Sequence, residues 1–432
     1  MSERFIIRGG RPLRGTVEVR GSKNAAPKLM IASLLTDEEC VIDHVPFSVE
    51  IDITKELCER VGGTVAVKDH TCTMRMKTIT TSLVSDLSRK NRIPILALGP
   101  LLHRTGVAEV PVLGGCPIGH RPINFHVEAL TKMGVTVERR EHTYFAKAKK
   151  IHGADISFPY PSVGATENVI LAAVLAEGTT RVRNAAVEPE IGNLIQMLQA
   201  MGARISFAPE RREIHITGVS RLRGAHISTM PDRSEIVSFA AAALATDGDI
   251  FIPNIDETYL GAFLEALDLM GAHHDVEKGG IRFYGTRPYA PAIITTSPHP
   301  GFMTDWQQPF SVLLTQAEGA SIIHETVYED RLGYTQDLKR MGADIEISTQ
   351  CPYEEKCRYA GMAYHHTARI IGPRRLLGSE MSMTDVRAGM AHIVAALTAG
   401  GESVISGIEH VDRGYERIDE RLRELGADIR RV

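Results

Sequence analysis

The stretch Gln199-Ala200-Met201-Gly202-Ala203 leads directly into Arg204-Ile205-Ser206-Phe207, in which polar and apolar residues alternate. We interpret it as the end of an amphipathic helix, a left-handed glycine cap and a short strand with one buried face. The same phrase recurs along the whole chain. Its glycines are Gly62, Gly134, Gly202, Gly271, Gly342 and Gly426, at spacings of 72, 68, 69, 71 and 84 residues. This regularity predicts a protein of six structural repeats.

A second, more apolar helix precedes each glycine cap, as in residues 241–248 and 395–401. These segments carry almost no charge, so we predict that they are buried, whereas the helices that end at the caps are half exposed. Each repeat then needs neighbours to cover its apolar helix. Six repeats fit two domains of usual size better than one, and residues 227–232 are the predicted crossover between them.

The composition is that of a soluble globular protein, with 43% hydrophobic and 24% charged residues and a formal net charge of −4 among 432 residues. A mildly acidic chain has no global positive field for nucleic acid, so any anion site must be local. The longest apolar run, residues 93–102, is about half as long as a membrane span. Residues 1–4 lack the apolar core of a signal peptide. We therefore expect a cytoplasmic protein that binds neither nucleic acid nor membrane.

The six cysteines are too sparse for a disulfide framework, and no Cys-x-x-Cys pair occurs. Cys351 and Cys357 lie in a polar stretch without a partner pair of His or Cys at zinc spacing, so we expect free thiols there. The doublets His273-His274 and His365-His366 are expected at the surface. Neither a Walker lysine motif nor Gly-x-Gly-x-x-Gly is present, which removes the common nucleotide-binding fingerprints.

Polar and charged residues recur where the apolar helices begin, at a similar phase of every repeat. They are Ser22-Lys23-Asn24, Arg92, Ser162-Val163-Gly164-Ala165-Thr166, Asp232-Arg233, Thr304-Asp305 and Thr384-Asp385-Val386-Arg387. The Ser, Thr and Asp members can be N-caps, and Asp232 with Glu235 has capping-box spacing. The cations among them oppose the helix dipole, which is favourable only if an anion binds between them. The pattern therefore predicts several helix starts around one cleft for an anionic substrate.

Two further segments are candidates for chemistry. Residues 113–122 contain three glycines and two prolines around Cys116, with Arg121 close behind. A thiol beside a cation can have a lowered pKa and act as a nucleophile or acid, while an incidental loop cysteine is the alternative. The segment Asp412-Arg413-Gly414-Tyr415-Glu416-Arg417 places two arginines on one helical face. Its alternative interpretation is an exposed helix start with Glu–Arg pairing.

These motifs resemble those of the enolpyruvyl (1-carboxyvinyl) transferases, and the resemblance covers essentially the whole chain. The matching pieces are Gly21-Ser22-Lys23-Asn24-Ala25-Ala26, Ala97-Leu98-Gly99-Pro100-Leu101, Gly114-Gly115-Cys116, Gly119-His120-Arg121-Pro122, Ser162-Val163-Gly164-Ala165-Thr166, Pro231-Asp232-Arg233, Thr304-Asp305, Glu325-Thr326-Val327, Thr384-Asp385-Val386-Arg387 and Asp412-Arg413-Gly414-Tyr415-Glu416-Arg417. The resemblance implies a two-domain inside-out α/β barrel with three βαβαββ units per domain. Residues 23–230, with the Cys116 loop, would form the first domain. Residues 1–22 and 231–432 would form the second, with the active site in the cleft between them.

The implied reaction moves the enolpyruvyl group of phosphoenolpyruvate to the 3-hydroxyl of UDP-N-acetylglucosamine and releases phosphate, the first committed step of peptidoglycan synthesis. No metal and no organic cofactor are expected, and the protein would be a monomer. The reaction must protonate the enol carbon and deprotonate the sugar hydroxyl. By resemblance Cys116 is the proton donor and Asp305 the base. A carboxylate near a helix N-terminus should have a depressed pKa, so orienting the hydroxyl is the alternative role of Asp305.

The resemblance assigns the remaining site residues to binding. Lys23, Arg121 and Arg413 would clamp the phosphate and carboxylate of phosphoenolpyruvate, with Arg387 as a further cation. The other substrate-binding residues would be Asn24, Arg92, Pro122, Asn124, Phe125, Ser162, Val163, Gly164, Asp232, Val327 and Asp385. The Cys116 loop would close over the substrates and exclude water.

Three positions depart from the family's usual pattern. Asn124 stands where an Asp is common, Tyr160-Pro161 occupies a stretch where some members carry a Lys, and Pro27-Lys28 replaces an apolar-Pro order. They put the nucleotide contacts in doubt. Two alternatives therefore stay open: transfer to another acceptor, such as a different nucleotide, sugar nucleotide or shikimate 3-phosphate, and a catalytically silent scaffold that binds nucleotide sugars. The Gly-Gly-Cys loop argues against the shikimate branch, and the presence of both the clamp cations and Cys116 argues against the scaffold.

Overall fold

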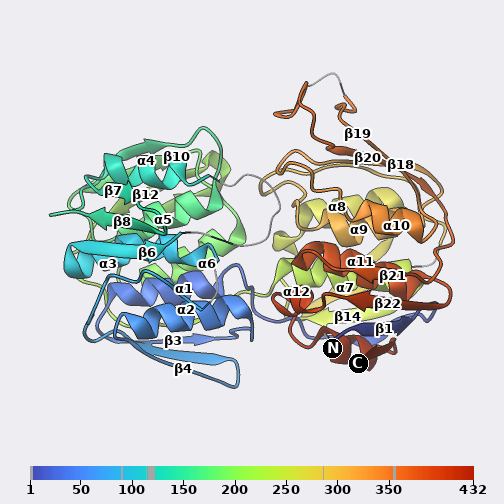
Figure 1. Ribbon diagram of the computed structural model, residues 1–432, viewed down its shortest axis with the longest axis horizontal. Coiled ribbons are helices and arrows are strands. Elements are labelled where there is room, and N and C mark those ends of the chain that lie inside the picture. Colours follow the sequence, from blue (N-terminus) through green and yellow to red (C-terminus); the bar gives the residue numbers. More distant parts are fainter. Residues whose placement is uncertain (1–2, 89–90, 113, 115–121, 286, 354–356) are drawn as a thin grey trace. The chain divides into compact units, whose positions relative to one another are not determined.

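The computed structural model describes residues 3–88, 91–112, 114, 122–285, 287–353 and 357–432 (Figure 1). The chain forms two compact units. The C-terminal unit contains the described residues up to Val19 together with Pro231–Val432, and the N-terminal unit contains those from Arg20 to Met230. Cys116 and Arg121, two of the predicted site residues, lie outside the described residues.

Three four-stranded sheets belong to the C-terminal unit, in the orders β21-β22-β1-β23, β15-β16-β14-β2 and β17-β18-β20-β19. Each combines one parallel pair with two antiparallel pairs. Strand β1, near the start of the chain, pairs with β22 and β23 near its end (Figure 1). The strands are β1 (Phe5–Arg8), β2 (Arg14–Thr16), β14 (Asp249–Pro253), β15 (His273–Glu277), β16 (Gly280–Tyr284), β17 (Ile293–Thr295), β18 (Gly319–His324), β19 (Asp344–Ser348), β20 (Thr367–Gly372), β21 (Glu380–Ser382), β22 (Glu402–Ser406) and β23 (Asp428–Arg431).

The N-terminal unit repeats this plan in the orders β11-β12-β10-β9, β13-β3-β5-β4 and β6-β8-β7. In the last sheet the parallel partner of β6 is reduced to an isolated bridge between Leu83 and Glu109. The strands are β3 (Glu39–Asp43), β4 (Thr64–Lys68), β5 (Thr71–Arg75), β6 (Val107–Pro111), β7 (Thr136–Arg139), β8 (Thr143–Lys147), β9 (Asp155–Ser157), β10 (Thr179–Arg183), β11 (Arg204–Ala208), β12 (Glu213–Thr217) and β13 (His226–Ser228).

The apolar helices lie inside the units, as the sequence predicts. Every residue of α7 and α9 is buried, and these two helices pack against α11 and against each other. Each unit has one continuous hydrophobic core that these helices share with the inner faces of the sheets. The inner helices are α1 (Ala26–Ala32), α3 (Leu98–Thr105) with the 3-10 turn η2 (Ile93–Ala97), α5 (Val163–Ala173), α7 (Arg233–Ala245), α9 (Gln307–Leu314) and α11 (Val386–Thr398).

The amphipathic helices end at the predicted glycines. All six repeat glycines have positive φ, from 68° at Gly271 to 102° at Gly202. These helices are α2 (Val49–Arg60), α4 (Asn124–Lys132), α6 (Pro189–Ala200), α8 (Gly261–Met270), α10 (Thr335–Arg340) and α13 (Ile418–Glu424), and a short helix α12 (Glu409–Asp412) precedes α13. The six-repeat α/β architecture predicted from the glycine spacing is therefore confirmed.

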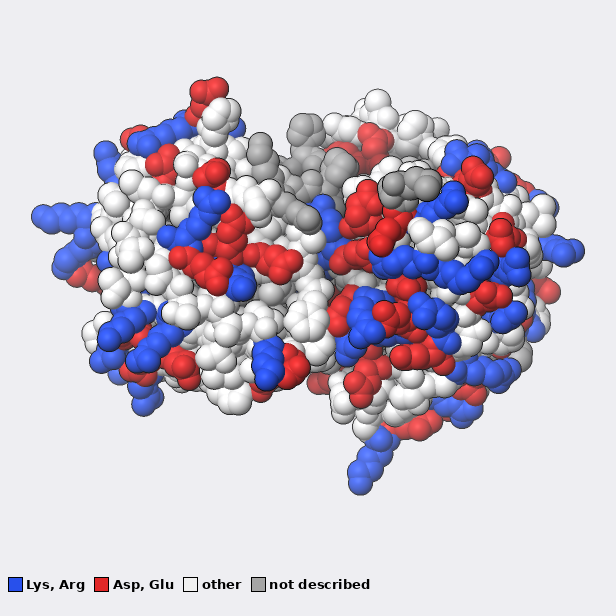
Figure 2. All heavy atoms as spheres, turned by 60° about the horizontal axis from the view of Figure 1, so that its bottom comes forward, with Lys and Arg blue, Asp and Glu red and all other residues white. Residues whose placement is uncertain are grey.

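Charged side chains of both signs lie on the surface that Figure 2 displays. Lys and Arg side chains are interspersed there with Asp and Glu on both units. No helix among the described residues is long and apolar enough to cross a membrane. Because surface charge of both signs is common, it does not locate an anion-binding site. The cations at the starts of the buried helices are the better candidates for such a site.

Candidate active site

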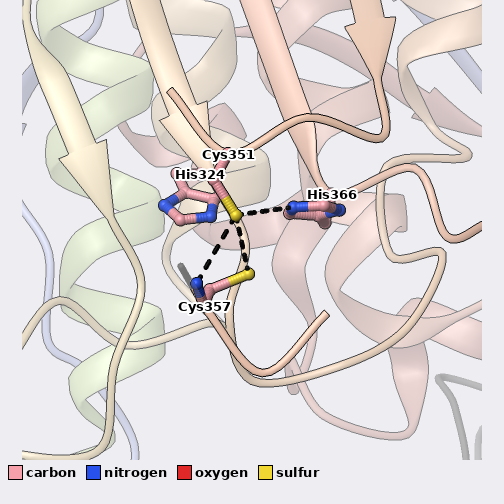
Figure 3. A group of neighbouring side chains, drawn as sticks. All are labelled: His324, Cys351, Cys357 and His366. Carbon is pink, nitrogen blue, oxygen red and sulfur yellow. Dashed lines mark hydrogen bonds between the residues drawn. The ribbon is translucent and has the colours of Figure 1, made fainter. Parts of the chain in front are cut away.

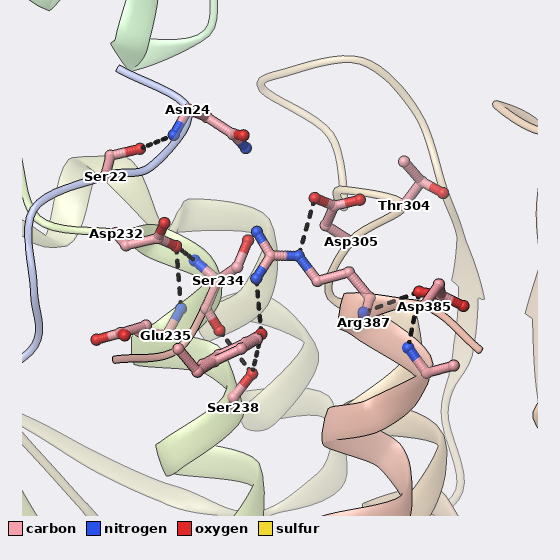
Figure 4. A network of polar contacts seen from close by, with 12 residues as sticks. Ser22, Asn24, Asp232, Ser234, Glu235, Ser238, Thr304, Asp305, Asp385 and Arg387 are labelled. Atoms are coloured by element: carbon pink, nitrogen blue, oxygen red, sulfur yellow. Dashed lines mark hydrogen bonds and ion pairs between the residues drawn. The ribbon is translucent and has the colours of Figure 1, made fainter. Parts of the chain in front are cut away.

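In the C-terminal unit, the buried helices α7 and α11 begin at aspartates that cap them (Figure 4). Asp232 Oδ1 accepts the backbone N–H groups of Ser234 and Glu235 at 2.9 and 3.1 Å. Asp385 Oδ1 accepts those of Arg387 and Ala388 at 2.8 and 3.0 Å. The capping interpretation is confirmed for both aspartates, so one oxygen of each is committed to a helix end.

Asp305, just before α9, is held by two arginines. Its Oδ1 lies 2.6 Å from Arg331 Nη2 and its Oδ2 3.1 Å from Arg387 Nε. Both arginine side chains are 4% exposed, whereas the Asp305 side chain is 20% exposed. The two guanidinium groups therefore balance the charge of a carboxylate that remains partly exposed.

Arg387 is also fixed from a second direction. Its Nη1 donates to the Tyr415 hydroxyl at 2.7 Å, and that hydroxyl lies 2.9 Å from Ser238 Oγ on α7. Burial raises the pKa of Tyr415 to about 12, so the phenol is neutral at physiological pH. The third nitrogen, Nη2, is buried and has no hydrogen-bond partner among the described residues. A buried guanidinium donor without a partner is costly, and an incoming anion would satisfy it.

The segment after β18 is tied to the start of α9 by Glu325, which is fully buried. Its Oε1 accepts the backbone N–H groups of Val327 and Tyr328 at 2.7 and 3.0 Å. Its Oε2 accepts the Thr304 hydroxyl at 2.7 Å. Val327, a predicted substrate contact, is thus positioned relative to Thr304 and the neighbouring Asp305. Arg413, at the end of α12, is partly exposed.

In the N-terminal unit, the start of α1 places Lys23 and Asn24 in partly exposed positions. Ser22 Oγ accepts the Asn24 backbone N–H at 3.3 Å. One turn later, Lys28 Nζ lies 3.6 Å from Glu167 Oε1 of α5. Burial raises the pKa of Glu167 to about 7, against the opposing effect of the Lys28 charge. Lys28, which departs from the family pattern, therefore interacts with a buried carboxyl group on another inner helix, α5.

The start of α5 is packed closely against α4. Ser162 Oγ accepts the Ala165 backbone N–H at 3.4 Å, which confirms Ser162 as an N-cap. A Cβ on Gly164 would lie 3.2 Å from the ring of His126. Burial, with the charge of nearby Arg92, lowers the pKa of His126 to about 3, so this imidazole is neutral. The predicted residues Arg92 and Gly164 therefore lie near one buried histidine. Ser162 and Val163, which precede Gly164, are partly exposed.

The predicted nucleotide contacts at the start of α4 are less buried. Asn124 is the first residue of α4 and is exposed, as is Pro122. Phe125 is partly buried, with its ring centroid 6.2 Å from that of Phe158. These side chains are accessible for binding, and the role of Asn124 stays a prediction.

One residue of this polar network escaped the sequence analysis. Arg331 lies in the run Glu329-Asp330-Arg331, which reads as an exposed charged turn. The fold instead buries Arg331 beside Asp305, with 7% of the residue exposed. The sequence feature that could have indicated a role for Arg331 is its closeness to the Glu325-Thr326-Val327 motif.

The chain has six α/β repeats in two units, and its apolar helices lie inside those units. These features define the class of inside-out α/β barrel proteins. Solved structures of enolpyruvyl transferases share this fold: the enolpyruvyl transferase NikO from Streptomyces tendae has a TM-score of 0.87 at 23% identity, covering 100% of this chain and 99% of its own. An EPSP synthase from Acinetobacter baumannii has a TM-score of 0.73 at 19% identity, with 100% of both chains covered. The family model for EPSP synthase (3-phosphoshikimate 1-carboxyvinyltransferase) matches residues 7–422. The chain belongs to this family, as its motifs predicted.

Curated relatives are considerably more similar in sequence than these structures. A UDP-N-acetylglucosamine 1-carboxyvinyltransferase from Protochlamydia amoebophila (strain UWE25) is 44% identical, over 98% of this chain and 93% of that protein. One of the same name from Desulfosudis oleivorans (strain DSM 6200 / JCM 39069 / Hxd3) is 41% identical, over 100% of this chain and 99% of that protein.

Proposed function

We propose that this protein transfers the enolpyruvyl group of phosphoenolpyruvate to the 3-hydroxyl of UDP-N-acetylglucosamine and releases phosphate. The observation that carries the proposal is the full-length identity of 41 to 44% to relatives named for this transferase activity. The buried arginine pair around Asp305 supports it, because it supplies fixed charge for an anionic substrate beside a partly exposed carboxylate.

The reaction needs one proton delivered and one removed. The CH2 carbon of phosphoenolpyruvate gains a proton while the sugar hydroxyl attacks the adjacent carbon and loses its proton. The resulting adduct then expels phosphate and loses a proton from the new methyl group, which restores the carbon–carbon double bond and leaves an enol ether on the sugar. We assign proton delivery to Cys116, and contact with the attacking hydroxyl to Asp305.

Asp305 is better suited to orient the hydroxyl than to act as a strong base. Two guanidinium groups stabilise its ionised form and reduce its tendency to take up a proton. A fixed carboxylate oxygen is still a good acceptor for the O–H group, and holding that group in line for attack lowers the barrier. This role is the alternative that the position of Asp305 at a helix start already suggested.

Binding of phosphoenolpyruvate is assigned to cations from both units. Lys23, Arg121 and Arg413 would hold its phosphate and carboxylate, and the unpartnered Nη2 of Arg387 supports adding that residue to the set. Residues 23–230 and residues 1–22 with 231–432 would then act as two domains on the same pair of substrates. We further infer a cytoplasmic, monomeric enzyme of peptidoglycan synthesis that needs no cofactor.

The test is phosphate release from phosphoenolpyruvate with a panel of acceptors. We expect release only when UDP-N-acetylglucosamine is added. Phosphate release with shikimate 3-phosphate or another nucleotide, but not with UDP-N-acetylglucosamine, would show that the enolpyruvyl group is transferred to a different acceptor. Saturable binding of the sugar nucleotide without any release would instead support a silent scaffold and refute the proposal.

A further inference from the structure

Four potential metal ligands meet at one end of the sheet β17-β18-β20-β19: His324, Cys351, Cys357 and His366 (Figure 3). One ligand atom from each lies within 4.8 Å of all the others. Cys351 Sγ lies 3.6 Å from His366 Nε2 and 3.3 Å from Cys357 Sγ. This cluster lies in the C-terminal unit and shares no residue with the proposed active site.

The sheet brings the two histidines together. His324 is the last residue of β18 and pairs with Thr367, the first residue of β20, so His366 immediately precedes the neighbouring strand. The loop from β19 to β20 then carries Cys351 and Cys357 back over this end. The sequence predicts free thiols at Cys351 and Cys357, and both cysteines are free in the structure. It also predicts a surface position for His366, which is wrong, because His366 is fully buried. Strand pairing brings both histidines beside the two cysteines, although the spacing along the chain did not indicate such a cluster.

The histidines are arranged as metal ligands usually are. His366 Nδ1 lies 2.9 Å from the Tyr364 carbonyl oxygen, so it donates there and leaves the Nε2 lone pair facing Cys351. His324 is 3% exposed, and neither of its ring nitrogens has a hydrogen-bond partner among the described residues. A buried imidazole without a partner is unfavourable unless something else binds it, and a metal ion would do so.

Each sulfur atom also accepts a backbone N–H group. The backbone N–H of Cys357 lies 3.5 Å from Cys351 Sγ, and that of Tyr359 lies 3.4 Å from Cys357 Sγ. The Sγ–Sγ distance of 3.3 Å is far from the ~2.05 Å of a disulfide. It is close to the roughly 3.7 Å that two thiolates subtend at a tetrahedral zinc with bonds of about 2.3 Å.

We propose that His324, Cys351, Cys357 and His366 bind one Zn²⁺ ion as a structural site. Two sulfur and two nitrogen ligands in a tetrahedral set favour zinc over the harder cations, which prefer oxygen. On binding, the two thiols release two protons, and the two thiolates balance the charge of the ion. Four protein ligands leave no position for water or substrate, so the site holds the fold rather than catalyses a reaction.

The ion would fix the loop between β19 and β20, and through it the segment after β18. Within that loop, Tyr359 donates its hydroxyl to the Val327 carbonyl oxygen at 2.9 Å. The backbone N–H of His365 donates to Asp330 Oδ1 at 3.1 Å. Tyr359 thus holds the carbonyl group of Val327 while Glu325 holds its N–H group. Loss of the ion should therefore loosen this segment without removing any substrate contact directly.

Zinc content tests the proposal without any assay of activity. Untagged full-length protein, purified with reductant and without chelator, should contain about one zinc per chain by elemental mass spectrometry. The double variant Cys351→Ser/Cys357→Ser should contain roughly tenfold less. The matched control is His365→Gln, which alters the exposed neighbour of His366 and should keep the zinc of the unmodified protein. Equal zinc in the double variant and the control would place the metal elsewhere and overturn the proposal.

A second measurement uses only the unmodified protein, in case the double variant does not fold. Cys351 and Cys357 should resist alkylation until a strong chelator is added, and Co²⁺ added afterwards should give the visible spectrum of a tetrahedral site with thiolate ligands. Immediate alkylation of both cysteines, a Cys351–Cys357 disulfide in the reduced protein, or Co²⁺ without this spectrum would each contradict a zinc site.

Discussion

Arg387 links three buried helices of the C-terminal unit. It lies on α11, pairs with Asp305 at the start of α9, and donates to Tyr415, which contacts Ser238 on α7. Burying a guanidinium group is costly, and here the shared carboxylate and one phenol offset part of that cost. Its buried Nη2 group has no hydrogen-bond partner among the described residues, so the planar guanidinium of Arg387 can still donate to an anion.

We predict that Arg387→Lys lowers kcat/KM for phosphoenolpyruvate by about 100-fold, because an ammonium group cannot contact Asp305, Tyr415 and a substrate anion in the same planar arrangement. Steady-state kinetics on folded protein check this. The control is Arg421→Lys, at a buried arginine that pairs with Glu235 at 2.7 and 2.8 Å and is not assigned to the substrate. A similar loss of kcat/KM in both variants would show that the effect is structural.

Single residues also mark the limit of sequence-based prediction. The caps Ser162, Asp232 and Asp385 were predictable because a cap depends only on the residues that follow it. Arg331, His324 and His366 were not, because their partners approach through strand pairing and helix packing between segments far apart in the chain. The signal for the fold is local and repeated, whereas the signal for these contacts is neither.

The helix pair α1 and α5 is joined by the buried contact between Lys28 and Glu167. Burial raises the pKa of Glu167 from about 4.5 in the unfolded chain to about 7 in the folded protein. A raised carboxyl pKa means that the folded state binds the proton more tightly. This contribution to stability is therefore fully present below about pH 4.5 and is lost as the pH rises through about 7.

Glu167→Gln cannot ionise and should escape this loss. The stability of the variant relative to the unmodified protein should rise by roughly 2 kcal/mol between about pH 5 and pH 8. Urea denaturation at several pH values measures this difference. Glu128→Gln, at an exposed residue of α4, serves as the control and should show no such slope. A stability difference that does not depend on pH for Glu167→Gln would contradict the assignment.

The glycine caps are the element-scale feature on which the repeat depends. Gly202 has a φ of 102°, and a Cβ there would approach no atom closer than 4.0 Å, so the cost of a side chain is one of backbone conformation alone. We expect Gly202→Ala to lower the free energy of unfolding by roughly 1 to 2 kcal/mol.

The matched control for this cap is Gly192→Ala within α6, where a Cβ meets nothing within 4 Å. Alanine favours the helix interior, so this change should be neutral or stabilising by up to about 1 kcal/mol. Chemical denaturation of the two variants compares them directly. Equal effects on stability would mean that the left-handed cap is not what Gly202 provides.

At the scale of the whole molecule, a net charge of −4 and a mixed surface coexist with a proposed anionic substrate (Figure 2). Arg387 is buried at the start of α11, where a charge acts more strongly than at the surface. Each of the six repeats provides a polar helix start, and four of these starts carry a cation. The family has the same fold in solved structures. The fold could be predicted because its sequence pattern occurs in six repeats. The identity of the acceptor could not be predicted in this way, because it depends on individual contacts such as those of Asn124.

Identification of the product tests the central claim most directly. Incubation with phosphoenolpyruvate and UDP-N-acetylglucosamine, followed by proton NMR, should show a new sugar nucleotide with two vinyl protons and an enol ether on the 3-oxygen. An unchanged sugar nucleotide, or an enolpyruvyl group found on any other acceptor or hydroxyl, would contradict the proposed function.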